Sequence, residues 1–490
     1  MIENLVRAYL DDYHDIQVKI DKQFCGGKSE KFHLLSVDEV FHLSVSSCEE
    51  RKDCCVYQLK YAGDLSIGEP YQIMVENGYR TPLKYRFIVK TKRFNEEFFY
   101  DGDDLGCTVY DDRVSFAVWA PTACAVKLKI ENGHQEIMEM TRGEKGVYRL
   151  DISPECLGSN YRYLVKINDD WRSTLDPYGR ASRPNGARNV VTDLRNLKVE
   201  KREMPRFDKY TDAVIYETSV RDITAEGTFL ALSENLDYIR ELGITHLQLM
   251  PVNDFGSVDE EHPDLYYNWG YDPVQYQCLE GSYSSNVKDP LQGIRDFRRL
   301  VENAHEKGLR INLDVVFNHV YIMNQSAFDK LVPYYYFRFD KHNHLSNGSY
   351  CGNDFDSKML MARKYIVDTV RYYIDQFDVD GFRFDLMGIL DLETMELVDS
   401  ELRKVKPEIM LYGEGWNMPT ALADSEKCTK DKHSQLPDVA FFNDVFREVI
   451  KGSTFESTYK GYGTGKKEMA DEAMKVLDGR VLGSRQQTIN

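Results

Sequence analysis

Between about residues 213 and 442, short apolar segments alternate with longer stretches in which apolar residues recur at helical spacing. Six of the apolar segments have the length and composition of buried strands. Apolar strands separated by amphipathic helices are typical of a parallel sheet whose faces are covered by helices. The six predicted strands are 213–216, 245–250, 309–317, 381–384, 409–412 and 439–442.

The segments between these strands predict helices with recognisable ends. Asp289 and Pro290 form a cap and first-turn pair, ahead of a helix that stops near Gly308. A second helix is expected from Ser233 to Leu242, and another from Asp391. Because polar residues able to do chemistry follow three of the strands, the best-fitting fold is α/β, a (β/α)8 barrel of the TIM type.

The first 181 residues show a different pattern, in which apolar and polar residues alternate over short stretches. Residues 1–97 predict a small β-rich domain, with examples of alternation at 55–61 and 85–90. Residues 98–181 predict a β-sandwich, because the alternation is sharper and repeats at 114–121, 126–130 and 161–166. An irregular connector is expected at 182–205, which leaves 206–490 for the barrel.

The charge and cysteine content of the chain bear on which binding partners and which cellular compartment are expected. The formal net charge of −18 disfavours nucleic acid and anionic membrane surfaces, whereas a neutral polysaccharide is indifferent to it. The ten cysteines are scattered without a CxxC pair, and we interpret them as reduced thiols. The N-terminus turns acidic within a dozen residues and lacks a basic start followed by an apolar core. We therefore expect a cytoplasmic protein.

Three carboxylate-bearing stretches stand at strand ends, in a fixed order. They are Asp314-Val-Val-Phe-Asn-His319, Gly381-Phe-Arg-Phe-Asp385 and Tyr412-Gly-Glu-Gly-Trp416. An apolar strand that ends in Asp is common, so each stretch alone is weak evidence. Together they place two carboxylates on neighbouring parallel strands with an Arg beside one of them, which is the arrangement that glycoside cleavage needs.

These stretches resemble the first three of the four short regions of the α-amylase family of glycoside hydrolases. A further run, Tyr267-Asn-Trp-Gly-Tyr-Asp-Pro273, is similar to the hallmark of type I pullulanases, which cut α-1,6-glucosidic links. The resemblance covers about residues 98–490 and is strong from 213 onward. It also extends to the sandwich, which resembles the starch-binding type of module that precedes the barrel in debranching enzymes.

The resemblance implies roles for two carboxylates. Asp385 would be the nucleophile, and Arg383, two residues earlier on the same face of its strand, would hold it ionised and aimed. Glu414 would be the general acid/base and must carry a proton to donate to the leaving oxygen. Gly413 and Gly415 are expected to leave room for a sugar. The reaction would retain anomeric configuration through a covalent glycosyl-enzyme.

Further residues are expected to bind an α-glucan polysaccharide or oligosaccharide. His319 would hydrogen-bond the sugar at the cleavage point, Tyr271 would stack beneath it, and Asp314 is expected to be a buried structural carboxylate. The full predicted set of substrate-binding residues is Arg383, His319, Tyr271, Asn268, Trp269, Asp272, Asp314 and Trp416. We expect no cofactor, and no spacing compels a metal site, although the acidic loop 254–261 does not exclude calcium.

Two tryptophans of the sandwich are candidate sugar platforms. Trp119 lies inside an alternating strand and is expected in the core, whereas for Trp171, which follows a turn-like Asn-Asp-Asp run, exposure and burial both stay open.

The strand count predicts an incomplete barrel. The run Gln486–Asn490 resembles the entry to strand seven, and the fourth family region, with its third carboxylate, is not in this sequence. We therefore expect the fragment to be inactive alone. Two alternatives to a pullulanase-type enzyme stay open. One is an isoamylase-like or glycogen-debranching enzyme, and the other is an α-glucan-binding protein without catalysis.

Overall fold

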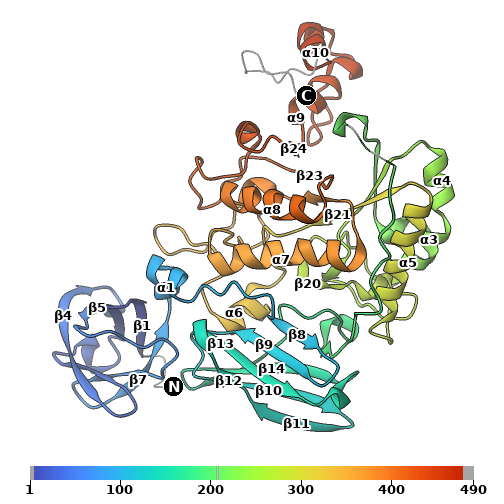
Figure 1. Cartoon of the computed structure of the whole chain (residues 1–490). Helices are drawn as coiled ribbons and strands as arrows, with labels where there is room; N and C mark the ends of the chain where they lie inside the picture. The colour runs from blue at the N-terminus through green and yellow to red at the C-terminus, as the bar shows by residue number, and fades with distance from the viewer. Residues whose placement is uncertain (1–4, 206, 208, 478–490) are drawn as a thin grey trace.

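The structure, a computed structural model, describes residues 5–205, 207 and 209–477. Along the chain it forms an N-terminal β-barrel, a β-sandwich and a layered unit of parallel strands and helices (Figure 1). In the described ranges, no helix is long and apolar enough to cross a membrane. The expected entry to strand seven at 486–490 lies outside the described residues.

The N-terminal unit is a closed barrel in the order β1-β2-β5-β4-β3-β6-β7, completed by parallel pairing of β7 with β1. Side chains of β1 alternate between buried and half-buried, as the sequence pattern predicts. Residues 87–90 are not a strand, because they form the short 3-10 turn η2 (Phe87–Lys90), which leads into helix α1 (Lys92–Glu97). The barrel strands are Val6–Asp12, Asp15–Asp21, Phe32–Leu35, Val40–Glu50, Cys54–Lys60, Gln72–Val75 and Arg80–Tyr85.

The sandwich has two antiparallel sheets, in the orders β11-β10-β14-β15 and β12-β13-β9-β8. The expected irregular connector at 182–205 contains one element of this unit, because β16 pairs with β14. The strands β8 to β16 are Gly106–Val109, Val114–Trp119, Ala125–Asn132, His134–Glu139, Thr141–Arg142, Val147–Ile152, Asn160–Ile167, Asp170–Thr174 and Asn189–Val190.

The third unit contains a parallel sheet in the order β17-β18-β21-β22-β23-β24. All six strands overlap the segments predicted from the sequence, with ends shifted by a few residues. They are Ile215–Thr218, His246–Leu249, Arg310–Val315, Gly381–Phe384, Met410–Gly413 and Val439–Phe441. A two-stranded excursion, β19 (Asn253–Phe255) with β20 (Pro273–Leu279), follows β18 and carries the 267–273 motif.

Helices cover this sheet, and their ends differ in places from those predicted. Asp391 caps α8 as predicted, through Thr394 N–H. The helix predicted from Asp289 begins later, at Gln292, because Asp289 Oδ1 accepts from Leu291 N–H and closes a turn first. The stretch predicted as one helix, 233–242, is divided at Asn235 between α3 and α4. Helices α2 to α8 are Val220–Ile223, Phe229–Glu234, Leu236–Glu241, Gln292–Glu306, Ala327–Leu331, Leu360–Phe377 and Leu392–Val405.

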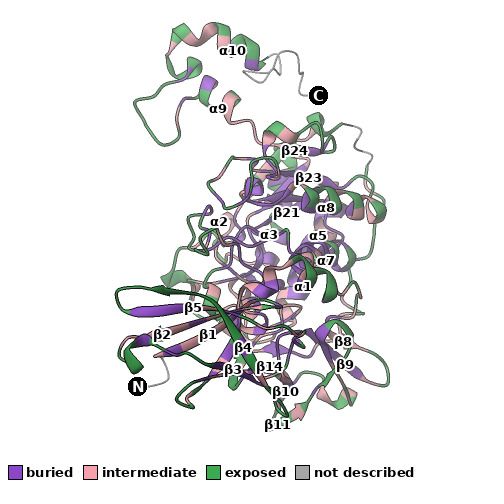
Figure 2. Cartoon of the chain, turned by 90° about the vertical axis from the view of Figure 1, so that its left-hand side faces the viewer, coloured by how far each residue is buried: buried purple, intermediate pink, exposed green. Residues whose placement is uncertain are grey.

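Two further helices, α9 (Asp444–Ile450) and α10 (Ala470–Leu477), form a small lobe beyond β24 (Figure 1). Buried Val449, Ala473 and Val476 make a satellite cluster there, apart from the main core. Figure 2 shows the lobe standing away from the body, whereas buried residues concentrate around the parallel sheet.

One hydrophobic core runs through the three larger units. Phe94 of α1 and Trp119 of β9 both pack against Tyr335, with ring centroids 6.0 and 4.8 Å away. The N-terminal barrel and the sandwich are therefore packed onto the segment that connects β21 with α7.

Candidate active site

The guanidinium of Arg383 is the centre of the site. It lies near the end of β22, and its Nη1 contacts Asp385 Oδ1 at 2.8 Å. Its Nη2 contacts Glu414 Oε1, just after β23, also at 2.8 Å. Because the two strands are parallel neighbours, Arg383 opposite Tyr412 in register, both carboxylates reach one cation. The two residues predicted to do the chemistry are therefore separated by a single guanidinium group.

Asp314 is the third carboxylate bound by Arg383. It is the penultimate residue of the buried strand β21, accepts from Arg383 Nη1 at 2.9 Å and from Tyr271 Oη at 2.6 Å, and is almost fully buried. Burial raises the pKa of Asp314 to about 7 against the opposing effect of Arg383. Burial lowers the pKa of Arg383, but the three carboxylates outweigh it and raise that pKa. Asp314 thus occupies the buried position expected for it.

Asn318 is a site residue that the sequence reasoning missed. Its Nδ2 donates to Asp385 Oδ2 at 2.8 Å and to the Asp385 carbonyl at 2.9 Å. Its Oδ1 lies 2.6 Å from Nδ1 of the buried His319, whose pKa burial lowers to about 4. The signal was present in the Asp314–His319 stretch, where an amide stands between the strand and the expected sugar-binding histidine.

Leu386, directly after Asp385, has a left-handed backbone with φ 41° and ψ 46°. This conformation is costly for a branched side chain and is found where the surroundings enforce it. It aims Leu386 N–H at Glu414 Oε2, 3.2 Å away, while Gly388 N–H donates to the Glu414 carbonyl at 3.0 Å. A Cβ on Gly388 would lie 1.9 Å from the Trp416 carbonyl oxygen. The turn after the predicted nucleophile, Asp385, is thus packed closely against Glu414 and the residues that follow it.

The two glycines that flank Glu414 serve the fold, rather than a sugar as expected. A Cβ on Gly413 would lie 2.5 Å from the Phe384 carbonyl oxygen. A Cβ on Gly415 would lie 2.5 Å from the Phe441 ring. In both cases the space that the missing side chain would need is already filled by a neighbouring strand.

The 267–273 motif divides into internal and exposed residues. Tyr271 is half-buried, with Arg383 5.9 Å from its ring centre, and burial raises its pKa. Asn268 donates to the Gly256 carbonyl and to Asp272 and accepts from Gly270 N–H. Its side-chain amide therefore stabilises the turn. Asp272 is half-buried, and burial raises its pKa. Trp269 is exposed and donates to Tyr267 Oη.

Trp416, the last of the predicted binding residues, is half-buried and lies beneath the guanidinium of Arg447, 5.8 Å from its ring centre. In the sandwich, Trp119 is core, because it is buried and its Nε1 donates to Phe98 O. Trp171 is exposed, with Lys127 Nζ 5.1 Å from its ring centre. The predicted burial of Trp119 is confirmed, and Trp171, whose exposure the sequence left open, lies at the surface.

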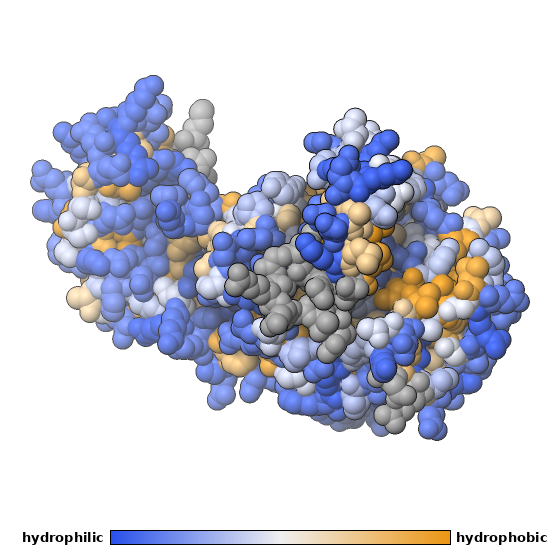
Figure 3. Space-filling model, turned by 90° about the horizontal axis from the view of Figure 1, so that it is seen from above, coloured by the Kyte–Doolittle hydropathy of each residue, from blue (hydrophilic) through white to orange (hydrophobic). Residues whose placement is uncertain are grey.

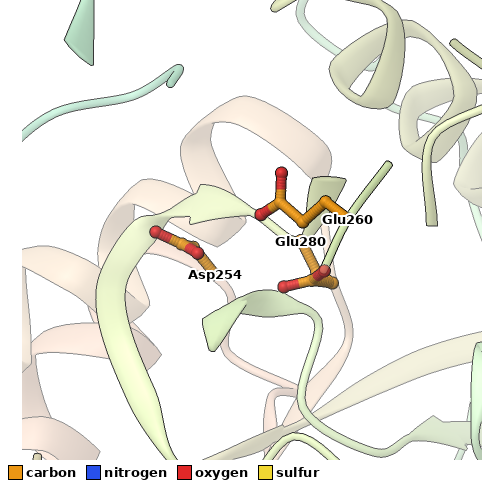
Figure 4. Close-up of side chains that lie close together, drawn as sticks. All are labelled: Asp254, Glu260 and Glu280. Carbon is orange, nitrogen blue, oxygen red and sulfur yellow. The ribbon is translucent and has the colours of Figure 1, made fainter. Parts of the chain in front are cut away.

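One group of side chains beside the 267–273 motif could hold a cation. Buried Asp254, Glu260 and Glu280 bring carboxylate oxygens within 4.8 Å of one another (Figure 4). Hard divalent cations such as Ca²⁺ prefer oxygen ligands of this kind. Each carboxylate also accepts from the protein, Asp254 from Gln275 Nε2, Glu260 from Asn185 N–H and Glu280 from Ser282 N–H.

The same carboxylates retain protons more readily than ordinary acids. Burial raises the pKa of Glu260 to about 7, and burial with neighbouring carboxylates raises that of Asp254 and Glu280 well above the usual range. Protons therefore neutralise part of this cluster near neutral pH.

Comparison with known proteins matches each unit to a described family. Residues 7–90 match "Pullulanase N1-terminal domain", residues 104–179 match "Carbohydrate-binding module 48 (Isoamylase N-terminal domain)", and residues 205–337 match "Alpha amylase, catalytic domain". These matches follow the three structural units in order.

Whole-chain relatives agree with these matches. The chain is 38% identical to the pullulanase of Bacillus subtilis (strain 168), over 98% of this chain and 69% of that protein. It is 30% identical to pullulanase A of Streptococcus pneumoniae, over 86% of this chain and 36% of that protein. The crystal structure of the pullulanase from Anoxybacillus sp. LM18-11 superposes with a TM-score of 0.94 at 35% identity, over 97% of this chain and 71% of that one. The chain therefore belongs to the pullulanase family, whose catalytic domain is of the α-amylase type.

Proposed function

We propose that this protein is a debranching glycoside hydrolase that cleaves α-1,6-glucosidic links in pullulan and branched α-glucans, with retention of configuration. The observation that carries the proposal is the shared contact of Arg383 with Asp385 and Glu414, each at 2.8 Å. Retaining glycosidases need two carboxyl groups close together, one nucleophile and one acid/base. Solved relatives support an α-glucan ligand, since a pullulanase from Anoxybacillus sp. LM18-11 is described as complexed with maltotriose.

In this mechanism Asp385 attacks the anomeric carbon. Arg383 and Asn318 each donate to one of its carboxylate oxygens, so the side chain is held in a fixed orientation. Fixing the nucleophile in advance lowers the entropic cost of reaching the transition state. The C–O bond breaks as the glycosyl-enzyme ester forms.

Glu414 gives its proton to the leaving oxygen and later takes one from the water that hydrolyses the ester. Leu386 N–H donates to Glu414 Oε2, and Arg383 contacts the other carboxylate oxygen, Oε1. The mechanism requires that Glu414 Oε1 exchange its Arg383 contact for a proton before the leaving oxygen is protonated. Both carboxyl groups therefore accept from Arg383, and they differ in the second donor, which is the Asn318 side chain for Asp385 and the Leu386 backbone for Glu414.

We also propose that the six parallel strands belong to a (β/α)8 barrel that needs two further strands. Within the described residues, β17 pairs with β18 alone and β24 with β23 alone. Val214 and Ile215, at the β17 edge, are 49% and 39% exposed, which is unusual for a parallel strand. Figure 3 shows a continuous hydrophobic stretch of surface open to solvent on the face seen from above. Closing a barrel pairs its last strand with its first and covers such edges.

The test compares residues 1–490 with an extended enzyme, in which they are joined to the C-terminal part of the Bacillus subtilis pullulanase that follows its matched region. Both are incubated with pullulan and with linear amylose. The proposal expects the extended enzyme to release maltotriose from pullulan and to leave amylose largely intact, and residues 1–490 alone to release nothing. Release of panose from pullulan, or rapid breakdown of amylose, would contradict the proposed specificity for α-1,6-glucosidic links. Full activity of residues 1–490 contradicts the need for further strands.

A further inference from the structure

One charged side chain of the N-terminal unit is buried against the third unit. Lys90 closes the turn η2, and its ammonium donates to the Tyr335 carbonyl at 2.6 Å and to Asp356 Oδ2 at 2.8 Å. The Lys90 and Asp356 side chains are only 18% and 12% exposed. Burial lowers the pKa of Lys90, and the nearby Asp356 carboxylate opposes that effect. A cation is therefore held away from water by a carboxylate some 260 residues later in the chain.

Both contacts fall on one stretch of chain, residues 332–357, which we call the bridging segment. The N-terminal unit holds it at further points. Phe87 packs its ring against Tyr334, with centroids 5.7 Å apart. Asn95 Oδ1 accepts from Tyr335 Oη at 2.6 Å and from Leu360 N–H at 3.0 Å. These contacts tie the start of the segment, and the first residue of helix α7 just beyond its end, to the N-terminal unit.

The far side of the bridging segment holds the loop that orients the nucleophile. Phe355 N–H donates to the Asn318 carbonyl at 2.8 Å. Asn353 makes two hydrogen bonds to Val320, accepting from its N–H at 3.0 Å and donating to its carbonyl at 2.7 Å. Asn318 in turn donates to Asp385. Asp356 is thus linked to the nucleophile through its chain neighbour Phe355 and two successive hydrogen bonds, from Phe355 N–H to Asn318 and from Asn318 to Asp385.

Arg338 extends the same network to the other loops of the site. Its Nε faces Asp356 Oδ1 at 3.3 Å, and its Nη1 donates to the Ile389 carbonyl at 2.9 Å and to Thr420 Oγ1 at 2.8 Å. Ile389 follows Asp385 on the β22 loop, and Thr420 follows Glu414 on the β23 loop. Asp356 is therefore shared between Lys90 and an arginine that spans three loops around the carboxylates.

We propose that Lys90 is a positioning residue for Asp385, through which the N-terminal unit sets the geometry of the active site. The inference rests on the proposed function, since it gives Asp385 the role of nucleophile. Its physical basis is that breaking one side of a buried ion-pair network destabilises the charge that remains. Without the Lys90 ammonium, Asp356 would keep only the longer contact with Arg338, at 3.3 Å. Asp356 would then move toward Arg338 or water, carrying Phe355 and Asn353 with it. Displacements of about 1 Å at a reacting group are enough to cost as much as about 100-fold in rate.

Three variants of the extended enzyme test this. Lys90→Met keeps the length of the side chain and removes its charge, and Lys90→Arg restores a cation. Lys92→Met is the matched control, since Lys92 lies only two residues after Lys90, at the start of helix α1, but its side chain is 86% exposed and pairs with Glu96. The expected result for Lys90→Met is a fall in kcat of about tenfold or more, with KM on pullulan changed less than about twofold. Lys90→Arg should recover most of kcat, and Lys92→Met should match the parent.

A second measurement uses residues 1–490 and needs no activity. Hydrogen–deuterium exchange should become faster at the Val320 and Phe355 amides in Lys90→Met and stay unchanged in Lys92→Met. If Lys90→Met folds poorly, Asp356→Asn removes the Lys90 ion pair together with that of Arg338 and should give the same two signatures.

An unchanged kcat in Lys90→Met, or no recovery of kcat in Lys90→Arg, overturns the proposal. So does unchanged exchange at Val320 and Phe355. A parent extended enzyme that releases no maltotriose would instead refute the proposed function, and the exchange data would still decide whether Lys90 orders the Asn318 loop.

Discussion

The backbone N–H of Leu386 donates to Glu414 Oε2 across 3.2 Å, so the residue after the expected nucleophile helps to hold the expected acid/base. The contact depends on the left-handed conformation of Leu386, which glycine adopts freely and a β-branched residue resists. Leu386→Val should lower kcat of the extended enzyme, because strain on the order of 1–3 kcal/mol opposes the native turn. Leu386→Gly should retain more activity than Leu386→Val. The reverse order in steady-state kinetics on pullulan would show that the Leu386 side chain matters and its backbone does not.

Replacing either carboxyl by its amide should remove most of the activity. Asp385→Asn would remove the proposed nucleophile and Glu414→Gln the proposed proton donor, while both keep the shape of the side chain. We expect each to reduce kcat by at least about 10²- to 10⁴-fold, the range typical of lost acid–base catalysis. Thermal melting of each variant should stay within a few degrees of the parent. A variant that keeps more than about a tenth of the parent rate excludes that residue from its role.

The close contact at Gly388 predicts a large effect from one methyl group. Gly388→Ala places a Cβ 1.9 Å from the Trp416 carbonyl oxygen, so the backbone must shift. We expect a lower melting temperature for residues 1–490 and a lower kcat for the extended enzyme, because the turn around Glu414 is displaced.

Gly293→Ala is the matched control, since its added Cβ meets only an ordinary contact with Ser284, 3.5 Å away, inside helix α5. Alanine there should be neutral or stabilising. Equal melting temperatures for the two alanine variants would refute the steric argument.

The buried carboxylates near the 267–273 motif predict a pH-dependent stability. The pKa of Glu260 rises from 4.5 to about 7 on folding, chiefly through burial. Between these pH values the folded state binds a proton that the unfolded state has lost, so stability decreases as pH rises through that window. Glu260→Gln removes the contribution of Glu260 to this dependence, and its amide oxygen can still accept from Asn185 N–H. In EDTA, the variant should gain unfolding free energy relative to the parent between pH 5 and pH 8.

Glu261→Gln, at an exposed neighbour, controls for the loss of charge. If the free energy of unfolding differs between Glu260→Gln and the parent by the same amount at pH 5 and pH 8, the raised pKa of Glu260 is contradicted.

Much of the third unit is predictable from the sequence because its signals are local. Each strand there is a short apolar run, and Asp391 begins a helix with its own side-chain cap. Prediction from local signals is wrong where a second local contact competes. At Asp289 the side chain accepts from Leu291 N–H and forms a turn, so the helix begins only at Gln292. Such prediction also fails at Gly413 and Gly415, because which atoms fill the space around a glycine depends on neighbouring strands.

The site is predictable to the level of the family motifs and not beyond. Asp385, Glu414 and Arg383 stand in those motifs, and the structure brings them together. The supporting residues carry no comparable signal. Leu386 owes its role to a backbone conformation, and Lys90 meets Asp356 through folding of distant segments, in a stretch whose alternation predicts a strand.

The central claim is retaining cleavage of α-1,6 links by Asp385 and Glu414, and the anomer formed first tests it most directly. Pullulan is added to the extended enzyme, and the anomeric protons of the product are followed by NMR before mutarotation proceeds. The account predicts maltotriose whose new reducing end appears first in the α configuration, with the β anomer growing in later. Early accumulation of the β anomer, or a product other than maltotriose, would contradict it.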